Sequence, residues 1–246
     1  MTIGNPLDRH SAVVIPPGFV MIKEVFRNFG RYLTEFFRIE RHYDLEFVKK
    51  NVTIRNFSCI DKSLSEGKGA IMITGHIGNW ELAGATLSQL GYPITAVALV
   101  HKETLVNDLF DHQRRIKGIE IIPTQKAIRE GMAALEKNRI LAIVADRTFG
   151  SKGEVMDFLN RPTSLPKGPA QFSRLTGAPI LPIFFIRNDD YRYTLTIEDA
   201  IYPPTHSDKP EEEIVSDIMK RYLTCIERYI KQYPTQWLMF REYGVE

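Results

Sequence analysis

Residues 70–84 read AIMITGHIGNWELAG and carry the clearest structural signal in the chain. The apolar run from Ala70 to Ile73 is typical of a buried strand, and a histidine follows it on a turn flanked by glycines. Asn79 stands where it can cap a helix, and Glu81 falls in the first turn, where the helix dipole favours a negative charge. The stretch therefore predicts a strand, a sharp turn and a helix. It places a titratable base at the carboxyl end of the strand, where open α/β sheets bind their ligands.

The five-residue spacing of His76 and Glu81 is weak evidence by itself. The chain has 6 His and 30 Asp plus Glu residues, so such pairs also arise by chance. A second pair, His206 and Glu211, lies in a polar, proline-containing segment that we interpret as a solvated loop. Side chains five apart on one helix point about 140° from each other, so cooperation requires His76 to lie outside the helix. The flanking glycines permit that turn. The alternative is a surface histidine beside a helix whose acid only interacts with the helix dipole.

Length and composition set the broad class of the protein. With 246 residues and 43% hydrophobic content, the chain can bury one substantial core, so we expect a single domain, residues 1–246. A formal net charge of +2 argues against a nucleic-acid-binding protein. The two cysteines, Cys59 and Cys225, have no metal-ligand spacing, so neither a metal site nor a disulfide framework is expected. No apolar run approaches the ~20 residues that span a bilayer, so a membrane would be met from its surface.

Alternating strand and helix patterns extend the opening unit along the chain. Strands are expected at 70–74, 94–100, 119–122, 140–145, 179–186 and 191–197, and helices at 80–90, 103–117, 125–137, 170–176 and 210–232. Nearly continuous apolar strands in such an alternation indicate an α/β fold, with a mainly parallel sheet flanked by helices. We expect this core at residues 67–200, and a C-terminal helix and tail at 201–246. Residues 146–169 are expected to form an irregular loop, and loops of this length are usually functional.

The N-terminal region, residues 1–66, is expected to be helical after an irregular start of 17 residues. From Phe19 to Arg41, apolar side chains recur at spacings of three and four, with basic residues between them. Such an amphipathic helix, rich in aromatic and basic residues, suits a membrane interface. Packing of its apolar stripe on the core is the alternative. A second helical stretch is expected from Leu45 to Glu66.

Five stretches together resemble, in order and spacing, the bacterial lipid A biosynthesis acyltransferases, the lauroyl/myristoyl branch of the lysophospholipid acyltransferase superfamily. They are Gly75–Glu81, which resembles an H-x4-[DE] block, and residues 108–118, 145–150, 158–170 and 233–238. The resemblance implies a glycerol-3-phosphate/lysophospholipid acyltransferase-like fold. Two departures stand out. Asn160 occupies a position where the family often has glycine, and the hydrophobic N-terminal anchor that is usual in the family is not visible.

The resemblance implies transfer of a fatty acyl group from a thioester to a hydroxyl of a lipid, at the inner face of the cytoplasmic membrane. The donor would be acyl carrier protein or coenzyme A, with no further cofactor. A lipid alcohol is almost fully protonated at neutral pH, so a positioned base with a pKa near ~6.5 would take its proton. His76 fits that role, and Glu81 would accept a hydrogen bond from its other ring nitrogen. No enzyme nucleophile is needed, and the chain has no G-x-S-x-G elbow.

The resemblance further implies substrate contacts for Asn79, Arg114, Arg115, Asp146 and Gly168. The backbone N–H groups of Gly78–Trp80, at the helix start, are candidates for stabilising the oxyanion. Arg114 or Arg115 would supply positive charge or bind phosphates, with a solvated helix surface as the alternative. Asp146 follows a predicted strand, which suits a site-facing role, although a turn-initiating cap also fits. The last of the five, a glycine between lysine and proline, indicates a turn before a short helix.

Three other functions compete with lipid A acylation. Another branch of the superfamily would acylate a glycerolipid or a phosphatidylinositol mannoside. A non-catalytic peripheral lipid-binding protein could keep the same fold. A nucleotide-binding α/β protein is disfavoured, because neither G-x-G-x-x-G nor G-x4-G-K-[ST] occurs at a strand–helix junction.

Overall fold

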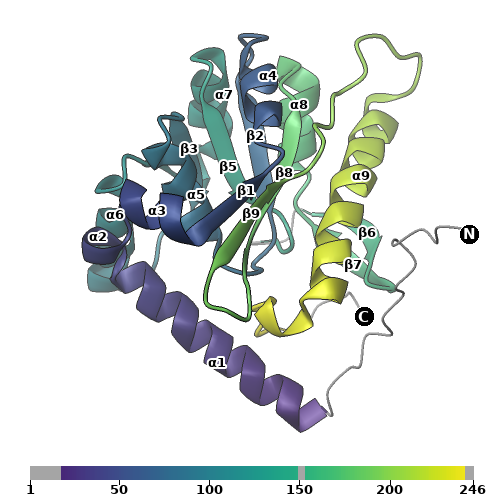
Figure 1. Ribbon diagram of the computed structural model, residues 1–246. Helices are drawn as coiled ribbons and strands as arrows, with labels where there is room; N and C mark the ends of the chain where they lie inside the picture. Colours follow the sequence, from purple (N-terminus) through teal and green to yellow (C-terminus); the bar gives the residue numbers. More distant parts are fainter. Residues whose placement is uncertain (1–17, 149–152, 242–246) are drawn as a thin grey trace, which may run out of the picture.

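The computed structural model describes residues 18–148 and 153–241, which form a seven-stranded sheet with helices on both faces and a separate two-stranded hairpin (Figure 1). The sheet strands are β1 (Val52–Arg55), β2 (Ala70–Thr74), β3 (Ile94–Ala98), β4 (Glu120–Pro123), β5 (Ile140–Val144), β8 (Ile180–Arg187) and β9 (Tyr193–Ile197). Their order is β1-β9-β8-β2-β5-β3-β4. Only the β8–β9 pair within this sheet is antiparallel, so the expected mainly parallel α/β sheet is confirmed.

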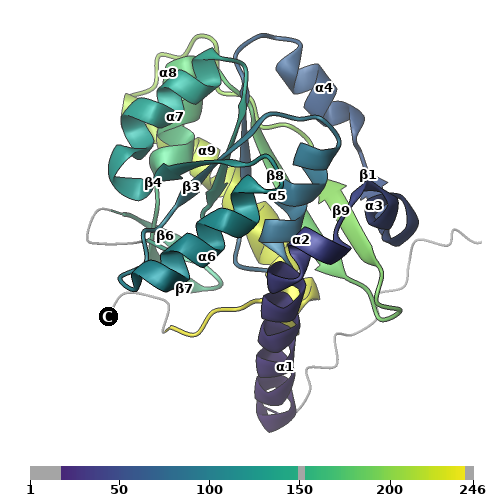
Figure 2. The same ribbon diagram turned by 90° about the vertical axis from the view of Figure 1, so that its left-hand side faces the viewer.

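The helices cover both faces of the sheet, apart from α1, which runs past the sheet's end (Figure 2). They are α1 (Gly18–Phe37), α2 (Ile39–His42), α3 (Leu45–Asn51), α4 (Ser58–Leu64), α5 (Trp80–Gln89), α6 (Thr104–Arg115), α7 (Ala127–Glu136), α8 (Gly168–Thr176) and α9 (Glu211–Gln232), with single 3₁₀ turns η1 (Thr124–Lys126) and η2 (Pro234–Gln236). Strand β2 shows why both faces are apolar. Ile71 and Ile73 pack in the cluster that contains α8 and α9, whereas Ala70 and Met72 pack in the cluster that contains α3 and α5.

The prediction of one helical stretch from Leu45 to Glu66 is wrong. Helices α3 and α4 do occupy its two ends, but β1 separates them and pairs in parallel with β9 at the edge of the sheet. Three of the four β1 residues, Val52, Thr53 and Ile54, are β-branched and favour extended backbone. Pairing with β9 supplies the hydrogen bonds that decide the conformation.

The prediction of an irregular loop over residues 146–169 is also wrong for most of its length. Strands β6 (Glu154–Phe158) and β7 (Arg161–Leu165) form an antiparallel hairpin. Its two turn residues, Leu159 and Asn160, both have positive φ, 53° and 61°, as a two-residue hairpin turn of type I′ requires. Asparagine tolerates this region better than most residues, which explains how it can replace a glycine here. Parts of two predictions, residues 149–152 and the first 17 residues, lie outside the described part of the chain.

Helix α1 is only partly covered by the core. Tyr32 and Phe36 are buried, whereas Phe26 is 61% exposed and Ile22 is 57% exposed. Figure 2 shows the N-terminal half of α1 projecting beyond the α/β core, while its C-terminal half passes the end of the sheet. No helix within residues 18–148 and 153–241 combines the length and the apolarity needed to cross a bilayer.

Candidate active site

His76 lies at a corner between β2 and α5, held by three backbone hydrogen bonds. Gly78 and Asn79 donate their N–H groups to the carbonyl oxygens of Gln236 (3.0 Å) and Phe185 (2.9 Å), and the His76 carbonyl accepts from Leu238 N–H (2.7 Å). Strand β8 and the segment after α9 therefore hold the corner in place through hydrogen bonds from two sides. Because the N–H groups of residues 78 and 79 are used in this way, the expectation that they would stabilise an oxyanion is wrong for both.

Glycine is required at position 78 by two independent constraints. Its φ is +65°, in the left-handed region that most side chains avoid. A Cβ atom built there would also lie 2.0 Å from the carbonyl oxygen of Phe185. The corner can thus approach β8 closely only without a side chain at this position.

Asp146 is the carboxylate that contacts the imidazole. It follows β5, the parallel neighbour of β2, so both side chains emerge at the same edge of the sheet. His76 Nδ1 lies 2.6 Å from Asp146 Oδ1, while Oδ2 accepts from the His76 backbone N–H (2.8 Å) and from Trp237 Nε1 (2.9 Å). Burial alone raises the pKa of Asp146, which is 1% exposed, but the charge and hydrogen bonds of His76 and the indole of Trp237 hold that pKa below its ordinary value.

The prediction that Glu81 accepts a hydrogen bond from His76 is wrong, because His76 Nδ1 bonds to Asp146 instead. The Glu81 carboxylate instead accepts two hydrogen bonds from Arg114, with Nε at 3.0 Å and Nη2 at 2.7 Å. Burial lowers the pKa of the Arg114 guanidinium, but the Glu81 carboxylate more than offsets this and raises it above its ordinary value. Glu81 thus forms a bidentate pair between α5 and α6, beside the imidazole rather than on it.

The second ring nitrogen of His76 faces Arg147, the residue after Asp146. Arg147 Nη2 lies 2.7 Å from His76 Nε2, and a guanidinium can only donate, so Nε2 is the acceptor and Nδ1 carries the proton toward Asp146. Burial lowers the pKa of Arg147, an effect that the Asp146 carboxylate opposes. This tautomer leaves the Nε2 lone pair as the basic position of the ring.

Two aromatic rings from different elements complete the wall beside the imidazole. Trp80 contacts His76 edge to face at 4.9 Å between ring centroids, and Tyr32 of α1 stacks on Trp80 at 4.5 Å. Helix α1, the first helix of the described residues, therefore contributes a side chain to the wall of the site.

A cavity of about 990 Å³ is lined by His76 together with side chains of the sheet and the surrounding helices. Its polar lining includes Glu81, Arg114 and Arg147, and also His101, Thr124, Gln125 and Arg241. Its remaining walls are mostly apolar and include Met72, Gly84, Ile94, Ala96, Ile119, Ala142 and Phe172. Phe29, Leu99, Phe110 and Phe240 also line it. Such a cavity suits a ligand with one reactive polar end and a long hydrocarbon part.

The other residues expected at the site are placed differently from one another. Arg114 and Gly168 line the cavity, and the side chain of Arg114 is only 12% exposed. Arg115 is 70% exposed in its side chain, pairs with Asp111 and does not line that cavity. Asn79 is buried and caps α5, since its Oδ1 accepts from Leu82 N–H at 3.1 Å.

Sequence reasoning assigned no role to Arg147 or Trp237. Arg147 directly follows Asp146, and Trp237 lies in the C-terminal stretch that supports the family resemblance. Their positions in these two stretches could have drawn attention to them, but only tertiary contacts show that both reach the His76–Asp146 pair. His206, the histidine of the second H-x4-E pair, is exposed in a loop as expected.

Comparison with known proteins gives one family and several relatives. The sequence model of the family described as bacterial lipid A biosynthesis acyltransferase matches residues 19–243. A phosphatidylinositol mannoside acyltransferase of Mycobacterium tuberculosis is 30% identical over 176 residues, which are 68% of this chain and 56% of that protein. The protein of the same name from Mycolicibacterium smegmatis is 26% identical over an alignment of 250 positions, which covers 97% of this chain and 79% of the relative. A lipid A biosynthesis acyltransferase of Haemophilus influenzae is 26% identical over 155 residues, 62% and 48% of the two chains. The chain thus spans little more than half the length of the tuberculosis relative.

Proposed function

Because the chain belongs to the bacterial lipid A biosynthesis acyltransferase family, we propose that it transfers a fatty acyl group from a thioester to a lipid hydroxyl, with His76 as general base. The observation that carries this proposal is the His76–Asp146 pair, whose imidazole lines a largely apolar cavity. The pair supplies the base, and the cavity supplies space for an acyl chain.

The reaction needs only one proton shuttle. The acceptor hydroxyl gives its proton to His76 Nε2 as its oxygen attacks the thioester carbonyl, forming a tetrahedral intermediate. Asp146 holds Nδ1–H in place and stabilises the imidazolium that forms. When the C–S bond breaks, the imidazolium returns the proton to the departing sulfur. This step releases the product ester and the free thiol of the donor and restores neutral His76, without a covalent enzyme intermediate.

Arg147 is our candidate for stabilising the oxyanion. Its guanidinium lies on Nε2, the position that the acceptor hydroxyl must reach, so substrate binding displaces it by a short distance. It then meets the thioester carbonyl oxygen, where negative charge develops. The Arg114–Glu81 pair in the same cavity fixes the α5 and α6 walls and leaves donors for phosphates of either substrate.

The acyl chain is proposed to lie between β2, β3, β5 and α5, where the cavity walls are apolar. Gly84 of α5 helps to open this space, since a Cβ atom at that position would lie 3.3 Å from Ile119 Cδ1. The length of chain that fits therefore depends on side chains at this end of the cavity.

We further propose that the cavity opens toward a lipid surface, at the inner face of the cytoplasmic membrane. Phe26 of α1 is largely exposed and packs on Phe240, a cavity-lining residue, with ring centroids 5.4 Å apart. On α6, Leu105 is 85% exposed. Exposed apolar side chains around a site mark contact with a membrane or another partner.

The donor is proposed to be an acidic acyl carrier protein. Lys102 and Lys126 are chain neighbours of cavity-lining residues, and their positive charges would attract such a carrier.

A second candidate acceptor is a phosphatidylinositol mannoside. Two of the relatives compared above bear that activity in their names, and one matches nearly the whole length of this chain. A lipid A precursor remains the other candidate, supported by the family and by the Haemophilus relative. Both acceptors offer hydroxyl groups to the same base.

The decisive experiment combines acyl donors with a panel of lipids. Acyl carrier proteins bearing chains of several lengths, and the matching coenzyme A thioesters, are incubated with lipid A precursors, phosphatidylinositol mannosides and glycerolipids, followed by mass spectrometry. We expect an acylated lipid, and a rate lowered by roughly 10²–10⁴-fold in His76→Ala. His206→Ala is the matched control, because it removes an exposed loop histidine. Equal activity of the two variants would refute the base, and no transfer to any lipid would refute the function. Slow thioester hydrolysis without acceptor would argue against a non-catalytic lipid-binding protein.

A further inference from the structure

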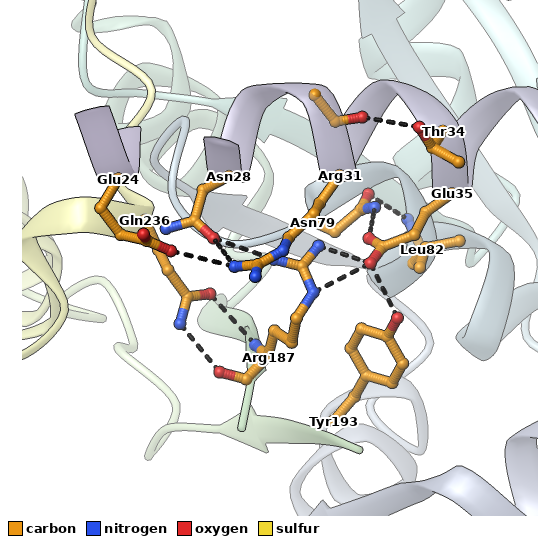
Figure 3. A network of polar contacts seen from close by, with 11 residues as sticks. Glu24, Asn28, Arg31, Thr34, Glu35, Asn79, Leu82, Arg187, Tyr193 and Gln236 are labelled. Atoms are coloured by element: carbon orange, nitrogen blue, oxygen red, sulfur yellow. Dashed lines mark hydrogen bonds and ion pairs between the residues drawn. The ribbon is translucent and has the colours of Figure 1, made fainter. Parts of the chain in front are cut away.

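A half-buried carboxylate of α1, that of Glu35, stands at the centre of a polar network next to the corner that presents His76 (Figure 3). Glu35 Oε1 accepts from Arg187 Nε (2.9 Å), Arg187 Nη2 (2.5 Å) and the Tyr193 hydroxyl (2.8 Å). Its Oε2 accepts from Asn79 Nδ2 at 2.8 Å. The side chains of Glu35 and Arg187 are 19% and 10% exposed, so this ion pair is largely removed from water.

The first route from Glu35 to the corner runs through Asn79. The Asn79 amide has a defined orientation, because its NH₂ group faces a carboxylate while its oxygen accepts the Leu82 N–H at the start of α5. Asn79 lies three residues after His76, and its backbone N–H holds the corner to Phe185. Glu35 therefore fixes the side chain that caps the helix immediately after the base.

The second route runs through Arg187 and Gln236. The backbone of Arg187 exchanges two hydrogen bonds with the Gln236 side chain, at 3.1 and 2.8 Å. The Gln236 carbonyl in turn accepts the Gly78 N–H. Both routes thus start at one carboxylate of α1 and end on consecutive residues of the corner that presents His76.

We propose that Glu35 is a positioning residue, which aligns His76 for proton transfer through Asn79 and Arg187. Burying an ion pair brings a desolvation penalty that an apolar pair avoids, so such pairs are weak devices for stability alone. A carboxylate with four donors, one from Asn79 beside the base and two from Arg187 of β8, is well suited to hold one geometry. The proposal rests on the proposed function, because its main readout is acyl transfer.

The network allows a test by reversal of donor and acceptor. In Glu35→Gln, the amide oxygen keeps Arg187, so its NH₂ group faces the NH₂ group of Asn79. In Asn79→Asp, the cap on α5 is kept, but two carboxylates oppose each other. The double variant pairs the Gln NH₂ group with the Asp carboxylate and retains the total charge. Glu24→Gln is the matched control on α1, since Glu24 pairs with Arg27 and Arg31 without contacting the corner.

We expect each single variant to lower kcat about tenfold with little change in KM for the thioester, and the double variant to recover to within about threefold of wild type. Glu24→Gln should match wild type. A purely structural role predicts lower melting temperatures with unchanged kcat below the transition. Wild-type kcat in Glu35→Gln, or a double variant as impaired as the two singles combined, overturns the proposal.

A readout independent of the substrate separates this proposal from the proposed function. The Nδ1 proton of His76, which is hydrogen-bonded to Asp146, is expected to give a low-field proton resonance in NMR. We expect its resonance to shift or broaden in Glu35→Gln and to return in the double variant. If the resonance behaves in this way but no acyl transfer is found with any variant, the proposed function fails and the positioning role stands. If His76→Ala abolishes transfer while Glu35→Gln leaves both kcat and the resonance unchanged, only the positioning role fails.

Discussion

Trp237 and Asp146, 91 residues apart in the chain, are joined by a hydrogen bond from the indole Nε1 to the carboxylate Oδ2 at 2.9 Å. The contact links the segment after α9 to the residue that follows β5. Together with the Leu238 N–H on the His76 carbonyl, it places the C-terminal segment on both members of the His76–Asp146 pair. The C-terminal segment is thus part of the candidate active site.

Trp237→Phe removes this donor while keeping an aromatic ring. The buried Oδ2 then keeps only the His76 backbone N–H, so we expect the free energy of unfolding to fall by about 1–3 kcal/mol and kcat to fall with it. Denaturant unfolding and steady-state kinetics measure the two effects. Tyr233→Phe is a control in the same segment. A variant with unchanged stability and rate would show that the indole does not support Asp146.

Asp146→Asn tests the pH dependence of stability. The pKa of Asp146 is lowered in the folded protein, so its contribution is fully present above the unfolded-state value near ~3.9 and is lost as pH falls toward the folded-state value. The variant lacks this titration. We therefore expect the stability difference between wild type and variant to shrink as pH falls below about 4, measured by urea unfolding between pH 7 and pH 3. A difference that is constant over this range would contradict the lowered pKa.

Gly78→Ala is expected to be far more damaging than an ordinary substitution at a left-handed glycine. The new methyl group would lie 2.0 Å from the Phe185 carbonyl oxygen, in addition to the φ penalty. Gly91→Ala isolates that penalty, because Gly91 also has positive φ, +94°, but no heavy atom lies within 4 Å of its built Cβ. We expect a loss of about 1 kcal/mol for Gly91→Ala and more than about 4 kcal/mol for Gly78→Ala. Similar melting temperatures for the two would show that the corner can move away from β8.

Arg114 and Arg115 form a matched pair of neighbours with opposite expectations. Arg114→Ala leaves the buried Glu81 carboxylate without its bidentate partner, which typically costs about 3–5 kcal/mol. It also removes a charge from the cavity, so KM for phosphate-bearing substrates should rise. Arg115→Ala removes an exposed side chain and should change stability by no more than about 0.5 kcal/mol. Thermal unfolding measures the loss of stability in both variants, and steady-state kinetics measures their KM values. A KM that rises in Arg115→Ala and not in Arg114→Ala would show that Arg115 is the substrate-binding arginine.

Gly84→Met probes the proposed acyl site. A flexible side chain at this position enters the cavity beside Ile119 and shortens the space for a hydrocarbon chain. We expect the preferred acyl donor to shift to shorter chains, measured by competition between thioesters of different lengths in one reaction. Gly30→Ala is the control, since its built Cβ contacts nothing within 4 Å. An unchanged chain-length profile would place the acyl chain elsewhere.

Local sequence patterns predicted the elements that depend on near neighbours. The β2 strand, the glycine turn and the capped α5 helix follow from apolar runs, φ freedom and capping within 15 residues. The edge strand β1 was missed because its conformation depends on β9, more than a hundred residues away. The hairpin β6–β7 was missed because its turn uses Leu159 and Asn160, without the glycine that usually signals such a turn.

The sequence by itself determined that a histidine would emerge at the end of a buried parallel strand, because the pattern of residues 70–84 encodes that corner locally. Only the tertiary structure decided which carboxylate serves it. Glu81, five residues on, is turned by its helix toward Arg114, while Asp146, 70 residues on, reaches Nδ1 because β2 and β5 are parallel neighbours. A hydrogen bond depends on distance in space, and the order of strands in a sheet sets that distance for residues far apart in the chain.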